Sequence, residues 1–166
     1  MQPPLLPEEA LARVLRLARL DGMGVLLLAT FFALTSAALG DFTGAVVWLL
    51  VAGAGAIELH GAILLHEAEK RGLNWLMASQ GLFLIVVLGH CALRLAHYDP
   101  TAMREALTDE MKATLAQAHY DQEDFLRTVY VTTYGALAAL TFLYKICLAF
   151  YYHRRRHAVA AAMATD

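Results

Sequence analysis

Six of the polar or charged residues inside the long apolar stretches of the sequence could do chemistry. A charged side chain in the hydrocarbon region of a membrane costs several kcal/mol unless it is paired or hydrated. Each residue of this kind is therefore a candidate for function. The six are Glu58, His60, Gln80, His90, Arg94 and Lys145.

Glu58 and Lys145 are predicted to form a buried ion pair. Each lies about 12 Å from the inner end of its apolar stretch, at ~1.5 Å of rise per helical residue. Gln80, near the inner end of another stretch, could donate to the same site. Tyr134 and Thr141 share a helical face with Lys145 and could line a path to it. The alternative is that the pair only fixes the register of the helices.

His60 follows Glu58 by two positions, so on a helix it projects to nearly the opposite side. The two side chains cannot both face the centre of one bundle. Gly53 belongs to a run of small residues, 52–56, that suits close contact between helices. We therefore expect a homo-oligomer with His60 and Gly53 at the interface between subunits.

His90, Arg94 and His97 fall on one stripe of a helix near the outer surface. We expect Arg94 to pair with a carboxylate of the following loop, such as Asp99 or Glu105. The stripe would then anchor the loop, or act as a pH-sensitive latch, because histidine titrates near neutral pH.

The elements that position these residues are four apolar stretches long enough to cross a ~30 Å hydrocarbon core as helices. The sequence thus predicts an all-α integral membrane protein, a four-transmembrane-helix bundle forming a single domain, 1–166. The spans are expected at about 23–39, 44–65, 73–96 and 129–152. A cleaved signal peptide is the less favoured interpretation of the first stretch, because the leader is long and carries acids.

Basic residues predict the direction of the spans, since they concentrate in cytoplasmic segments. With four crossings, the basic residues of the N-terminal arm, the second loop and the basic tail, 153–166, fall on one side, whereas the loop 97–126 on the other side holds seven acids and two basic residues. We therefore expect a multi-pass protein of a cell (inner) membrane with both termini in the cytoplasm. The basic residues on the cytoplasmic side are Arg13, Arg16, Arg19, Lys70, Arg71, Arg154, Arg155 and Arg156.

Two amphipathic segments lie outside the spans. Residues 7–20 predict an N-terminal helix at the interface, with a bend at Gly22 and Gly24, or else one long helix that enters the first span. Residues 99–120 predict a short extracytoplasmic helix that begins at Asp99-Pro100 and lies over the bundle as a lid or brace. Asp121 is expected to cap the helix that becomes the fourth span.

Composition excludes several classes of protein. The chain is 59% hydrophobic, more than a soluble domain of this size could bury, so the lipid bilayer is an expected partner. A net charge of −2 argues against nucleic acid. His60 and His90 differ too much in depth to bind one haem. No cofactor is predicted, and His66, His153 and His157 leave a metal site open without ligand spacing that supports one.

These observations favour a small oligomeric channel or transporter for an ion or proton, with Glu58 and Lys145 as its charged site. A structural or accessory membrane subunit, in which the same groups only lock the helices, is the main alternative. An enzyme acting on lipid or quinone near the inner histidines is weaker, because no nucleophile, phosphate-loop or zinc-helix motif is present.

Overall fold

The computed structural model describes residues 6–164, and this part of the chain is helical without strands. Four of its helices are long and apolar enough to cross a membrane, as the sequence predicts. The first five residues of the predicted domain and the last two of the predicted tail lie outside the described residues. The helices are α1 (Pro7–Ala38), α2 (Phe42–His66), α3 (Gly72–Ala96), α4 (Thr101–Glu105), α5 (Asp109–Gln117) and α6 (Gln122–Ala162).

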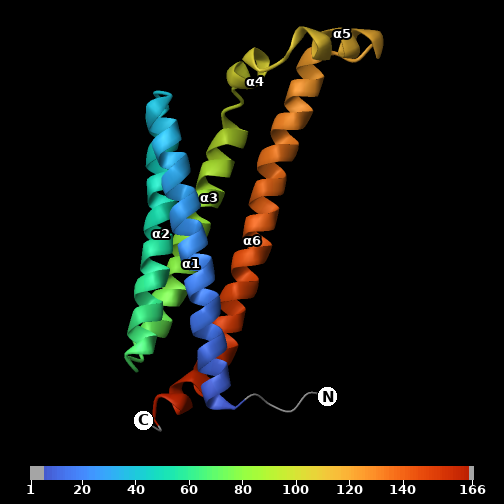
Figure 1. Ribbon diagram of the computed structural model, residues 1–166. Coiled ribbons are helices and arrows are strands. Elements are labelled where there is room, and N and C mark those ends of the chain that lie inside the picture. Colours follow the sequence, from blue (N-terminus) through green and yellow to red (C-terminus); the bar gives the residue numbers. More distant parts are fainter. Residues whose placement is uncertain (1–5, 165–166) are drawn as a thin grey trace.

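The four long helices form a bundle in which α1 contacts α2 and α6, and α3 contacts α2 and α6. α1 begins and α6 ends at the same end of the bundle, which we call the termini end (Figure 1). The α1–α2 turn, α4 and α5 lie at the opposite end, the α5 end. The connections agree with an even number of crossings.

α1 is one continuous helix of 32 residues, so the alternative of one long helix is confirmed and that of a separate N-terminal helix is wrong. Gly22 does not bend the chain but lets α1 and α2 approach closely. A Cβ atom added there would lie 3.1 Å from the Gly55 carbonyl oxygen, and one added at Gly55 would lie 2.8 Å from the Leu26 nitrogen. The first span was expected to begin at residue 23, but the helix that contains it, α1, begins at Pro7.

The predicted outer helix is instead two short helices, α4 and α5, and neither contains a buried residue. α5 extends sideways past the start of α6 and does not cover the bundle, so the predicted lid is wrong (Figure 1). The physical reason is composition, because charged residues at Asp109, Glu110 and Lys112 leave α5 only a narrow apolar face.

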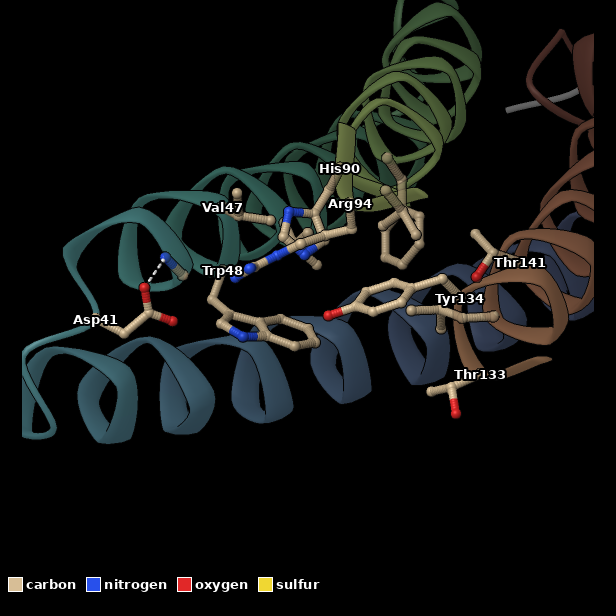
Figure 2. A pocket seen from close by; sticks show the side chains of 13 residues that line it. Asp41, Val47, Trp48, His90, Arg94, Thr133, Tyr134 and Thr141 are labelled. Carbon is tan, nitrogen blue, oxygen red and sulfur yellow. Dashed lines mark hydrogen bonds between the residues drawn. The ribbon is translucent and has the colours of Figure 1, made fainter. Parts of the chain in front are cut away.

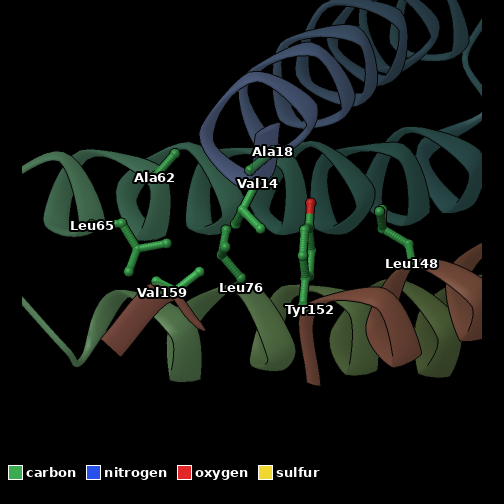
Figure 3. Close-up of a cluster of buried hydrophobic side chains, with 8 residues drawn as sticks. All are labelled: Val14, Ala18, Ala62, Leu65, Leu76, Leu148, Tyr152 and Val159. Atoms are coloured by element: carbon green, nitrogen blue, oxygen red, sulfur yellow. The ribbon is translucent and has the colours of Figure 1, made fainter. Parts of the chain in front are cut away.

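α6 runs for 41 residues, about twice the length that crosses a bilayer. Its N-cap is Asp121, as predicted, and the Asp121 side chain accepts hydrogen bonds from the Glu123 and Asp124 amides. Its last turns pack against the beginning of α1 and add Val159 to a buried apolar cluster at the termini end (Figure 3). The segment expected as a tail is therefore mostly helix.

The outer surface of the bundle is apolar. Large side chains such as Leu28 and Phe31 on α1, and Leu140, Leu143 and Phe150 on α6, are exposed. A soluble monomer rarely exposes so large a continuous apolar surface. This surface fits contact with the acyl chains of a bilayer.

Candidate functional site

The centre of the site is an ion pair between the first and last helices. The Lys145 ammonium on α6 lies 2.5 Å from Asp21 on α1, and the two side chains are only 2% and 6% exposed. The predicted direct pair of Lys145 with Glu58 is therefore wrong. The sequence interpretation placed Asp21 before the first span. Because α1 is continuous and packs along α2, Asp21 instead lies at the same level of the bundle as Glu58.

Two aromatic rings complete the surroundings of this pair. The Tyr144 hydroxyl donates to the second Asp21 oxygen at 2.8 Å. The Lys145 ammonium lies 4.4 Å from the centroid of the Phe83 ring, within cation–π range. Both oxygens of Asp21 and one side of the ammonium are therefore occupied, as a buried ion pair requires.

Glu58 is 1% exposed and is held by hydroxyl groups rather than by a cation. Tyr152 donates to one of its oxygens at 2.9 Å, and Ser79 lies 3.3 Å from the other. The Tyr152 side chain points its hydroxyl from α6 toward α2 (Figure 3). Within residues 6–164, no basic nitrogen lies within 4.0 Å of Glu58, although four salt bridges are found elsewhere.

The Ser79 hydroxyl has a second acceptor, the Ala54 carbonyl at 2.9 Å. A serine hydroxyl carries one hydrogen, so it donates to only one of the two acceptors at a time. Gln80, the next residue of α3, is also buried, and neither atom of its amide has a hydrogen-bond partner among the described residues. Buried amides without protein partners commonly bind ordered water.

All four long helices contribute to this group of residues, which we call the buried polar cluster. It contains two carboxyl groups and a single ammonium group. Sequence reasoning placed Glu58, Gln80 and Lys145 in one site but missed the other four members, which lie on α1, α3 and α6. The cluster consists of Asp21, Glu58, Ser79, Gln80, Tyr144, Lys145 and Tyr152.

Tyr134 and Thr141, predicted to line a path to the charged site, instead line a separate cavity of about 380 Å³ between α2, α3 and α6 (Figure 2). Glu58 and Lys145 are not among the residues around it. Phe83 connects the two regions, because its side chain lines the cavity and its ring contacts the Lys145 ammonium.

His90 and Arg94 also line this cavity, whereas His97 lines only a neighbouring open groove between α2 and α3. The predicted pairing of Arg94 with Asp99 or Glu105 is not formed in the described part of the chain. Arg104 on α4 forms the ion pair that joins the loop to α6, with Glu123 at 2.7 Å. The Asp99 carboxylate instead accepts from Thr101, whose hydroxyl and amide lower the pKa of Asp99.

His60 and Gly53, expected at a subunit interface, lie on the outward side of α2. His60 is exposed, with its ring 5.4 Å from the Trp75 ring in an edge contact. A Cβ atom added at Gly53 would meet nothing within 4 Å, whereas neighbouring Ala54 and Gly55 are buried inside the protomer. Most of the small-residue run therefore serves packing within the chain, and the oligomer stays a prediction.

Across residues 6–164, no three side chains of the metal-ligating types are gathered into one site. The chain matches no known protein family, and no curated protein and no solved structure is significantly similar to it. Fold and site together define an α-helical protein with four candidate membrane-spanning helices and an ionisable cluster buried among them.

Proposed function

We propose that the protein moves a proton or small cation across the membrane, with Glu58 as the exchange site. The observation that carries this proposal is the imbalance of the buried polar cluster. The Lys145 ammonium already neutralises Asp21, at 2.5 Å, and Glu58 accepts hydrogen bonds from hydroxyl groups, with the Asp21 carboxyl and the Lys145 ammonium as its charged neighbours. If Glu58 is ionised, the cluster holds two negative charges and the single positive charge of Lys145.

Physical chemistry indicates how such a carboxyl group would behave. An isolated charge in a low-dielectric interior is costly, so the resting site holds a proton or a small cation. When that charge leaves, the hydroxyls of Tyr152 and Ser79 stabilise the carboxylate by charge-assisted hydrogen bonds. The unpartnered Gln80 amide, next to Ser79 in α3, offers a place for the water that a moving proton or ion needs.

The proposed route enters from the α5 end through the cavity and reaches the cluster beside Phe83, which lies between the cavity and Lys145. Exposed basic residues at the termini end favour a cytoplasmic location for that end. The homo-oligomer remains part of the proposal, with the exposed side of α2 around His60 as the interface.

The test is flux into proteoliposomes that contain a pH-sensitive dye, repeated with sodium and potassium gradients. Glu58→Gln keeps the shape of the side chain but removes the exchangeable charge, and we expect flux to fall at least tenfold. Glu67→Gln, the same change at an exposed position, is the matched control and keeps full flux. Equal flux in the two variants, with equal folding, would remove Glu58 as the exchange site.

The alternative is a structural or accessory subunit, which the direct link between α1 and α6 through Asp21 and Lys145 favours. In that case the wild-type protein shows no flux above empty liposomes, whereas changes at the ion pair still destabilise the bundle. A single-protomer mass in nanodiscs by light scattering would remove the oligomeric part of the proposal.

A further inference from the structure

The cavity between α2, α3 and α6 has an unusual set of polar groups. Trp48, His90, Arg94 and Tyr134 all line it, and each carries a hydrogen-bond donor. Within residues 6–164, none of these four side chains hydrogen-bonds to a protein acceptor. Arg94 in addition has no carboxylate within 4.0 Å in that part of the chain. These four donors thus have no protein acceptor in the described part of the chain.

Asp41 is the one acidic residue of the wall, and it already has a structural role. Its carboxylate accepts a hydrogen bond from the Gly44 amide at 2.9 Å and so caps the start of α2 (Figure 2). Figure 2 also shows the Tyr134 hydroxyl pointing to the Trp48 side of the cavity. A molecule in this space would therefore meet mainly donors at its polar end.

The rest of the wall is apolar, with Val51, Val87 and Leu137 among its members. The volume, about 380 Å³, falls within the usual range for small-molecule sites. Arg94 lies in the last turn of α3, close to the expected membrane surface. The polar groups are thus near the surface, and the apolar walls reach toward the interior of the bundle.

A neighbouring groove gives this cavity a route to the bilayer. The groove lies between α2 and α3 and shares Val47, His90 and Arg94 with the cavity, so these side chains form a partition between the two spaces. The exposed apolar side chains of Leu50 and Leu93 line the groove. A molecule dissolved in the lipid could reach the partition from the side.

We propose that the cavity binds a lipophile from the bilayer whose head presents oxygen acceptors to Arg94, His90 and Tyr134. The head is a carboxylate, as in a fatty acid, or a pair of carbonyls, as in a quinone. The apolar body lies against the walls or extends through the groove. The proposed ion route passes through the same cavity, so a bound lipophile would obstruct it, but binding itself does not require ion transport at Glu58.

The chain contains two tryptophans, which makes a direct test possible. Trp48 lines the cavity. Trp75, on α3, lies outside the cavity and contacts His60 of α2. Trp75→Phe leaves Trp48 as the only fluorophore of its kind. In nanodiscs, a dibrominated fatty acid in one titration and a short-tailed quinone in another should quench Trp48 with a saturable curve.

Saturation with either probe supports the site and identifies its head group. In the same background, Arg94→Gln should raise the half-saturating concentration at least tenfold. Arg127→Gln, at an exposed arginine on α6 toward the same end, is the matched control and should change it less than twofold. Trp48→Phe, which keeps Trp75, should show only gradual, non-saturating quenching by probe dissolved in the lipid.

Non-saturating quenching of Trp48 by both probes would overturn the proposal. Equal curves for Arg94→Gln and Arg127→Gln would overturn it too. If Arg94→Gln does not fold, Tyr134→Phe removes a single donor with little change in shape. It should raise the half-saturating concentration about fivefold, as expected for one lost hydrogen bond, and an unchanged value would contradict the site.

Discussion

The two halves of the bundle differ in how their helices pack. At the termini end, apolar side chains from all four long helices pack into one cluster, and the polar groups above it, apart from Gln80, are bonded to one another. Toward the α5 end, α2, α3 and α6 surround a cavity whose donors have no protein acceptors. A second buried cluster, of Ala29, Val51, Ala52, Val87 and Cys91, also packs toward the α5 end, so the two halves differ in the cavity and not in having a core.

Breaking the ion pair should have the largest effect on stability. Lys145→Met leaves Asp21 buried without a counter-charge, so we expect the unfolding free energy to fall by about 3–5 kcal/mol. Unfolding by SDS titration in mixed micelles measures it. Asp21→Asn/Lys145→Met should cost less than Lys145→Met alone, and Lys112→Met, at an exposed ion pair, should cost almost nothing. A double variant as unstable as Lys145→Met would contradict the pairing.

Shortening one leucine in each half compares their packing directly. Leu76 is fully buried at the termini end, and Leu76→Ala should cost about 2–5 kcal/mol through lost contacts and a cavity. Leu137 borders the existing cavity and is 41% exposed, so Leu137→Ala should cost less than about 1 kcal/mol. The same SDS titration decides between them, and equal losses would mean that the halves are packed alike.

Removing one hydroxyl from each half should give the smallest difference. Tyr152→Phe takes a hydrogen bond from buried Glu58 and should cost about 1–2 kcal/mol. Tyr134→Phe removes a hydroxyl without a protein acceptor, so its effect should stay within about 0.5 kcal/mol. Melting followed by circular dichroism is sufficient here. If Tyr134→Phe proved the more harmful change, the cavity donors would have a structural role.

Much of this architecture could be predicted because it depends on local sequence. The lengths of the apolar stretches give four long helices, and Asp121 carries the signal for the start of α6. Helix periodicity also turns Glu58, Gln80 and Lys145 inward, and all three are buried. These features need only the geometry of one helix at a time.

The partner of Lys145 could not be found in that way. An acid beside Arg19 at the edge of an apolar stretch has the pattern of a span boundary, so Asp21 was not counted as buried. Its true position depends on the close approach of α1 and α2 at Gly22 and Gly55, which no single segment encodes. The position of α5 and the size of the cavity likewise depend on how α6 packs against α3.

The Asp21–Lys145 pair joins residues 124 positions apart, one on α1 and one on α6, so α1 is synthesised well before its partner. During biogenesis α1 must therefore enter the bilayer with its acid unmatched until α6 arrives. Only then can the helices close around the charge. A chain truncated before α6 would keep this uncompensated acid, and membrane quality-control proteases could recognise it as unfinished.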